Sequence, residues 1–129
     1  MRTTLLLLLL VSYAVEPAQA TETYLDAQAQ GKRDAMRPDH RSWYLNELRP
    51  AFSRFFGPTL NDCTSKVPNV QLQGFGLVFT VTPEGRVNRV FWKTENEFSA
   101  CVDAKLKSTM FQRSPLPEFF FGLEASRGS

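Results

Sequence analysis

The feature that most constrains this chain is a change of hydrophobic period at residue 74, where a repeat of two replaces helical spacing. Over residues 74–81 the large apolar side chains occupy alternate positions, which is typical of a strand with one buried face. Residues 82–85, Thr-Pro-Glu-Gly, are a turn signal, because glycine accepts positive φ at no steric cost. Residues 86–93 return as a second strand, so residues 74–93 predict a β-hairpin.

Two further features of the strands are informative. Val87 and Val90 on the return strand are three residues apart, which breaks the alternation and predicts a β-bulge near residues 88–89. Residues 118–124 predict a third strand, in which Phe119 and Phe121 face one way and Phe120 the other. A strand that is apolar on both faces is usually covered on both sides.

Helical segments flank the hairpin. Residues 94–97 form a capping-box pattern with Thr94 as the expected N-cap, and the helix that follows carries Cys101 on its apolar face. Before the hairpin, apolar residues recur at helical spacing from Trp43 to Phe56, with Pro50 expected to kink or split that helix. Gly57-Pro58 is expected to stop it and to open a further short helix over residues 59–66.

The first residues of the chain have the pattern of a secretory signal peptide. Arg2 precedes an apolar run over residues 5–15, and Ala18-Gln19-Ala20 is a small-x-small cleavage site. The run is shorter than the roughly 20 residues that span a bilayer, which argues against the alternative of an uncleaved anchor. We therefore expect cleavage after Ala20, a periplasmic or secreted protein and no stable membrane anchor.

The chain contains two cysteines, Cys63 and Cys101. An oxidising compartment favours a disulfide between them, which would contribute about 4 kcal/mol in the chain-entropy model. A metal or redox pair is the weaker alternative, because there is no Cys-x-x-Cys motif and the one histidine, His40, is distant in the sequence. We expect no metal and no cofactor.

The residues also argue against two classes of function. A formal net charge of +2 is too small for a dedicated nucleic-acid-binding protein, which would show a clustered basic face. Asp39, His40 and Ser42 are the residue types of a hydrolytic triad, but a triad is defined by geometry that three residues in so short a span do not achieve. We therefore expect a protein that is not an enzyme and has no catalytic residues.

The ordered motifs resemble the C-terminal domain of the energy transducer TonB, most closely its two-cysteine AgmX/PglI branch. The match comprises a cysteine on the first helix (Cys63), a Pro-x-Gly-Arg-Val-like turn (residues 83–87), Cys101-Val102 on a capped helix and the Pro115-x-Pro117 segment before an aromatic strand. The resemblance implies a small α+β domain of two layers, with two main helices on a three-stranded antiparallel sheet. It spans about residues 51–124 of a domain that we place at residues 41–124.

The remaining segments are assigned more simply. Residues 21–40 are read as a polar, frayed N-terminal arm with a helical turn or two, and residues 125–129 as a tail. TonB itself has an N-terminal membrane anchor and a long proline-rich linker, and the chain shows neither pattern. On its own it is therefore not expected to transmit inner-membrane energy.

The resemblance and the small sheet lead to a functional hypothesis. A three-stranded sheet exposes its edges, and TonB-like domains recruit a partner strand there. We expect a non-enzymatic adaptor of the Gram-negative envelope that binds a periplasmic or outer-membrane protein, with the strand of residues 118–124 as the edge. Phe119, Phe120 and Phe121 are the candidate contact residues, although core packing is the simpler interpretation of all three. The same edge could also form a homodimer.

The alternative hypothesis is an envelope structural or stress protein that binds peptidoglycan or another anionic surface. Its basis is the region of residues 32–54, where six basic residues outnumber three acidic ones. The simpler interpretation of this bias is a solvated helix face.

Overall fold

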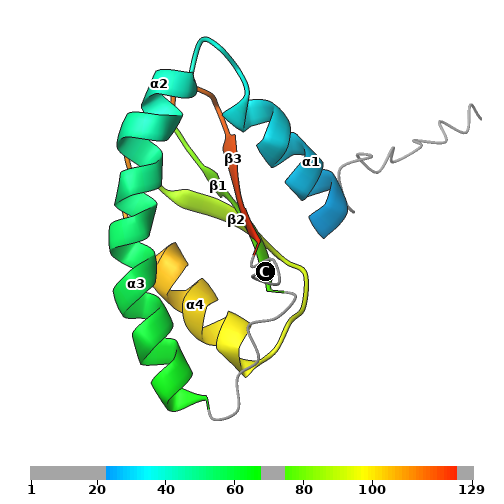
Figure 1. Ribbon diagram of the computed structural model, residues 1–129, viewed down its shortest axis with the longest axis vertical. Helices are drawn as coiled ribbons and strands as arrows, with labels where there is room; N and C mark the ends of the chain where they lie inside the picture. The colour runs from blue at the N-terminus through cyan, green and yellow to red at the C-terminus, as the bar shows by residue number, and fades with distance from the viewer. Residues whose placement is uncertain (1–22, 68–74, 125–129) are drawn as a thin grey trace, which may run out of the picture.

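The computed structural model describes residues 23–67 and 75–124 (Figure 1). The expected signal peptide and the C-terminal tail lie outside the described residues. None of the described helices is long and apolar enough to cross a membrane. The elements follow the order α1 (Tyr24–Ala35), α2 (Arg41–Trp43), the π-helical segment η1 (Tyr44–Leu48), α3 (Arg49–Lys66), β1 (Gly76–Val81), β2 (Val87–Trp92), α4 (Glu97–Lys107) and β3 (Phe119–Glu124).

The sheet is antiparallel and three-stranded, with the order β2-β1-β3, so the predicted α+β class and sheet are confirmed. The predicted turn closes the hairpin, and Gly85 adopts a φ of 84°. The bulge is also confirmed. Phe79 pairs with Val90 while Val81 pairs with Val87, so two residues of β2 lie opposite the single Thr80 of β1. The Thr80 hydroxyl accepts the displaced Arg89 N–H at 2.9 Å.

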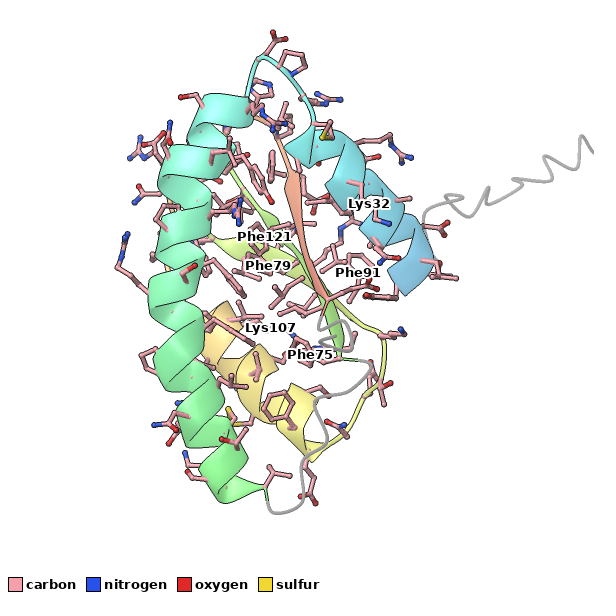
Figure 2. All side chains as sticks on the ribbon, viewed as in Figure 1. Lys32, Phe75, Phe79, Phe91, Lys107 and Phe121 are labelled. Carbon is pink, nitrogen blue, oxygen red and sulfur yellow. A yellow bond between two sulfur atoms is a disulfide. The ribbon has the colours of Figure 1, made fainter. Side chains whose placement is uncertain are left out.

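Helices α3 and α4 pack on one face of the sheet, as expected, and the main core lies between them. Phe79 of β1 and Phe121 of β3 project from the sheet toward α3 (Figure 2). Phe52 of α3 meets both, with ring centroids 5.6 Å from Phe79 and 4.7 Å from Phe121. The disulfide predicted between Cys63 of α3 and Cys101 of α4 is present and joins the two helices.

The long helical region departs from the prediction at its prolines. Helix α3 continues through Gly57 and Pro58 instead of ending there. Burial of Phe52, Thr59 and Cys63 on both sides of Pro58 stabilises the helix across the lost hydrogen bond. Pro50 directly follows the π-helical segment η1, and Leu48 and Arg49 both keep αR backbone angles, so the proline does not split the helical stretch.

The N-cap of α4 also differs from the prediction. The cap is Asn96 and not Thr94. The Asn96 side chain accepts the Ser99 N–H at 2.8 Å, and the Ser99 hydroxyl accepts the Asn96 N–H at 2.8 Å. An Asn–Ser box with both bonds formed therefore replaces the Thr–Glu box two residues earlier.

The largest correction concerns the N-terminal arm, because Tyr24–Ala35 is the three-turn helix α1 and not a frayed segment. It begins with a capping box between Thr23 and Asp26 and lies on the face of the sheet opposite α3 (Figure 1). Its buried residues are the small Ala27 and Gly31 together with Asp34, so the helix approaches the sheet closely without a wide apolar stripe. The sheet is thus covered on both faces, as the apolar pattern of β3 predicted.

Candidate functional site: the two edges of the sheet

The backbone of β3 shows which of its groups point away from the sheet. The Phe120 N–H donates to the Asp34 carboxylate of α1 at 3.0 Å, so it does not bond to β1. N–H and C=O groups of an antiparallel strand alternate in direction. Phe120, Gly122 and Glu124 therefore present their backbone groups to the outer edge, and the residues between them bond to β1.

Helix α1 closes the first half of this edge. Asp34 is only 1% exposed, and its carboxylate accepts the Gln30 amide at 2.9 Å besides the Phe120 N–H and lies 3.6 Å from Arg37 Nε. A Cβ placed on Gly31 would lie 3.5 Å from both the Phe120 oxygen and the Gly122 nitrogen. A partner strand has no room beside Phe120 while α1 is in place, and covering an edge with a helix is a common protection against unwanted pairing.

Tyr24 attaches the other end of α1 to the sheet. Its hydroxyl donates to Glu124 at 2.9 Å, and the ring lies against Gly76, where a Cβ would come within 2.2 Å of the Tyr24 oxygen. Burial raises the pKa of Tyr24, and the hydrogen bond to the Glu124 carboxylate raises it further. The phenol thus stays protonated and keeps donating this bond.

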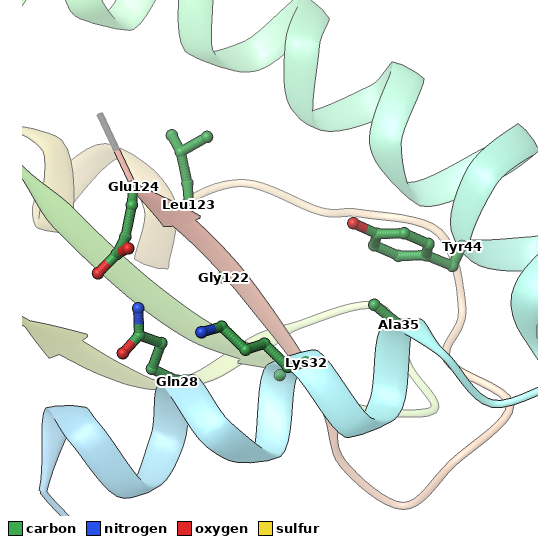
Figure 3. A pocket seen from close by; sticks show the side chains of 8 residues that line it. Gln28, Lys32, Ala35, Tyr44, Gly122, Leu123 and Glu124 are labelled. Carbon is green, nitrogen blue, oxygen red and sulfur yellow. The ribbon is translucent and has the colours of Figure 1, made fainter. Parts of the chain in front are cut away.

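A shallow pocket of about 200 Å³ remains beside the last part of β3 (Figure 3). In it the Gln28 side chain of α1 and the Glu124 side chain point toward each other, with Lys32 alongside and Tyr44 approaching from the opposite side. Of the β3 residues, only Gly122, Leu123 and Glu124 border this pocket. Residues of α1 line the same pocket, so a partner strand laid along this stretch would meet α1 there as well.

The predicted contact residues of β3 are all interior. Phe119 is 0% exposed, Phe121 4% and Phe120 7%. Phe119 packs against Trp43 and Tyr44, with ring centroids 5.0 and 5.9 Å away. Phe120 lies on the α1 face with Ala27 and Val78. In this conformation the three predicted contact residues pack in the interior and offer no exposed side chain, so their role in partner binding stays a prediction.

No named strand lies beyond β2 in the described part of the sheet, although an isolated antiparallel bridge between Arg86 and Met110 covers the edge at its start. The Lys93 N–H donates to the Gly76 oxygen of β1 at 3.0 Å. By the same alternation, Phe91 also bonds to β1, whereas Val90 and Trp92 point their backbone groups outward. The bulge lies just before this stretch, so the outer edge is regular from Val90 onward.

A groove of about 560 Å³ lies between this edge and α4. Trp92 forms part of its floor, and its indole N–H donates to Asp103 at 3.3 Å. Asp103 also pairs with Lys107 at 3.0 Å, on the following turn of α4. One strand edge and one helix therefore border the groove, which is lined by Val90, Trp92, Glu95, Asn96, Ser99, Ala100, Asp103 and Lys107.

On the face of the sheet that α1 covers, β2 presents charged and aromatic side chains. Arg89 lies over the rings of Phe91 and Phe120, at 5.5 and 5.1 Å, and donates from Nε to Glu118 at 2.9 Å. Burial alone would raise the pKa of Glu118, but hydrogen bonds from Arg89, Asn88 and Thr80 outweigh it and hold the pKa below its usual value. Figure 2 shows Phe91 on the α1 side of the sheet, away from Phe79.

The structure also places the residues of the other hypotheses. Asp62 lies beside Cys63 and Cys101 with donor atoms within 4.8 Å, but both sulfurs are in the disulfide and are not thiolate ligands. Asp62 pairs instead with Lys66 and Lys105, at 3.0 and 2.8 Å.

Among the described residues, no hydrogen bond joins the side chains of Asp39, His40 and Ser42. The Ser42 hydroxyl accepts a bond from Asn46 at 3.2 Å, and Asp39 is exposed. The basic residues of 32–54 are spread over α1, the following loop, α2 and α3. Lys32 belongs to α1 and Arg54 to α3, and these two helices cover opposite faces of the sheet (Figure 1).

The comparisons with known proteins add no identity. No protein-family model, curated protein or solved structure matches the chain. The resemblance to the TonB C-terminal domain stays a prediction that rests on the motifs alone.

The sequence reasoning missed Ala27, Gly31 and Asp34 as the residues that close the β3 edge. The Thr23-x-x-Asp26 capping-box pattern was a signal that could have revealed their helix.

Proposed function

We propose that this protein is a non-enzymatic binding or adaptor module of the bacterial envelope that takes an extended segment of another protein as an added strand at the edge of β2. The observation that carries the proposal is the outward direction of the Val90 and Trp92 backbone groups next to the groove along α4. Main-chain hydrogen bonds supply affinity in this mode of recognition, and pockets for alternate side chains supply specificity.

The comparison of the two edges selects β2. At β3 the Asp34 carboxylate already occupies the outward Phe120 N–H, and Gly31 lies against the neighbouring backbone. At β2 a partner strand would bond to Val90 and Trp92 and place every second side chain between the strand and α4. An adaptor that recruits its partner through β2 needs no rearrangement of α1.

Two features support the envelope as its location. The signal-peptide pattern directs the chain out of the cytoplasm, and the Cys63–Cys101 disulfide suits an oxidising compartment such as the periplasm. The partner would then be a periplasmic or outer-membrane protein, which agrees with the TonB-like motifs. A second copy of the chain is the other candidate partner for this edge. A molar mass in solution that rises with protein concentration would identify such a dimer.

A pair of arginine substitutions on α4 tests the proposal. Ala100 is exposed and lines the groove, whereas Ala104 is exposed on the same helix but outside it. Peptides selected from a random displayed library on the disulfide-bonded mature protein should bind Ala100→Arg about tenfold more weakly, because the new side chain fills the groove. Binding to Ala104→Arg should change by less than about twofold, since surface substitutions rarely matter more than this.

Two results would count against the proposal. One is a selection that yields no binding peptide. The other is a peptide that binds wild type, Ala100→Arg and Ala104→Arg equally, because it would then occupy a different surface.

A further inference from the structure

We infer that the segment taken up at β2 is one in which acidic side chains alternate with apolar side chains. The inference rests on the proposed function and specifies the partner's chemistry. It follows from the different groups on the two sides of the β2 edge, since successive side chains of an extended segment point to opposite faces.

The α4 side of the edge favours apolar side chains. Val90, Trp92 and Ala100 provide apolar surface in the groove. The Asp103 carboxylate is matched by Lys107 and by the Trp92 indole, so this ion pair offers no spare cation to an incoming acid. Glu95 at the same groove forms no ion pair with a described residue, and it would repel an acidic side chain on this side.

The α1 side favours acidic side chains. Lys93 is exposed, and its Cβ lies on this side, where a Cβ on Gly76 would come within 2.9 Å of it. Lys93 forms no ion pair with a described residue, whereas Arg89 next along this face is bonded to Glu118. Opposite charges on neighbouring strands attract and like charges repel. An acid beside Lys93 is therefore preferred to a base.

The half-buried Phe91 lies between these two cations and extends the surface available to the segment. The side chains on the α1 side thus meet Lys93 and an aromatic ring, followed by the Arg89–Glu118 pair, while those on the α4 side meet an apolar groove with an unmatched acid. A segment of alternating acidic and apolar residues satisfies both sides at once. A segment of alternating basic and apolar residues places its cations beside Lys93.

Three short synthetic peptides test the inference on the disulfide-bonded mature protein. In the first, valine alternates with glutamate; in the second, valine alternates with lysine; the third has the composition of the first but groups its glutamates together. We expect the first to bind more tightly than either of the others. The preference for glutamate over lysine should shrink as salt is added, because exposed charges are screened.

Substitution of Lys93 identifies the residue responsible. Lys93→Glu should weaken binding of the glutamate peptide by about threefold and strengthen binding of the lysine peptide by about as much. Changes of this size are expected when one exposed ion pair is lost or gained. Arg54→Glu makes the same charge change on the exposed surface of α3 and should leave both affinities unchanged.

The outcomes separate this inference from the proposed function. If no peptide, including those selected from the random library, binds at β2, the proposed function fails. A different result is that peptides bind and compete for the groove while the lysine peptide binds as tightly as the glutamate peptide, or while Lys93→Glu changes the affinity of neither peptide. In either case the proposed function stands and the inferred chemistry of the segment is wrong.

Discussion

The Asp34 carboxylate of α1 accepts the backbone N–H of Phe120 in β3 at 3.0 Å, across a sequence separation of 86 residues. A side chain of the N-terminal helix thereby takes the place that a neighbouring strand's carbonyl would occupy. The bond is buried, because Asp34 is 1% and Phe120 7% exposed. This contact and the close approach of Gly31 close β3 at Phe120, whereas no described residue bonds to the outward backbone groups of Val90 and Trp92 in β2.

Loss of the Asp34 carboxylate should destabilise the protein. Asp34→Ala leaves the buried Phe120 N–H without a partner, which costs about 1–3 kcal/mol. Urea unfolding of the disulfide-bonded protein measures this as a lower midpoint. Asp39→Ala, an exposed site on the loop after α1, is the matched control and should stay within about 0.5 kcal/mol of wild type. Equal free energies of unfolding for both variants would show that the contact adds nothing.

Two glycines on the α1 face of the sheet should respond differently to alanine. At Gly76 a Cβ would lie 2.2 Å from the Tyr24 hydroxyl oxygen and 2.9 Å from the Lys93 Cβ. Gly76→Ala should therefore cost about 1–3 kcal/mol from overpacking and push Tyr24 away from Glu124. At Gly122 a Cβ meets only a Val78 methyl at 3.7 Å, so Gly122→Ala should be tolerated. Thermal unfolding of both variants, together with tyrosine absorbance, checks the difference; equal losses would contradict it.

Acid should weaken the protein partly through Glu118. Its folded-state pKa lies below the ordinary value of 4.5, so its charged form stabilises the fold above that pH. This contribution is lost as the pH falls through the lowered pKa. The difference in unfolding free energy between wild type and Glu118→Gln should therefore be largest near about pH 7 and shrink toward about pH 3. Glu84→Gln, in the exposed hairpin turn, should follow the wild-type profile. A constant gap between wild type and Glu118→Gln would refute the assignment.

Reduction of the disulfide should have a large effect on stability. Cys63 and Cys101 are separated by 38 positions, and the chain-entropy model assigns a loop of this length about 4 kcal/mol. Urea unfolding with and without a thiol reductant measures the difference. Free cysteines in the protein purified from the periplasm would overturn the disulfide and count against the resemblance to the two-cysteine TonB-like branch.

The hairpin could be predicted from the sequence because its signals are local. The alternation of Phe79 and its neighbours, the glycine at the turn and the three-residue step from Val87 to Val90 each correspond to a backbone feature that the structure contains. The features that the sequence did not predict depend on packing between residues distant in the sequence. Pro58 remains inside a helix because the residues on both sides of it are buried in the core.

The closed edge was the least predictable feature. The buried face of α1 consists of Ala27, Gly31 and Asp34, which have little apolar surface, so the segment lacks a hydrophobic stripe. Asp34 has a buried partner only because β3 lies beside it in the fold. The sequence pointed to β3 as the binding edge and the structure favours β2, because the direction of the backbone groups at an edge depends on the pairing register, which the sequence does not show.

Amide hydrogen exchange in the presence of a selected peptide tests the central claim most directly. In the free protein the Val90 and Trp92 amides should exchange quickly, because they point away from β1, and the Phe120 amide should be protected by Asp34. Peptide binding should slow exchange at Val90 and Trp92 and leave Phe120 unchanged. Protection that appears along β3, accompanied by faster exchange in α1 and no change at Val90 and Trp92, would show that the partner displaces α1 and that β2 is not the binding edge.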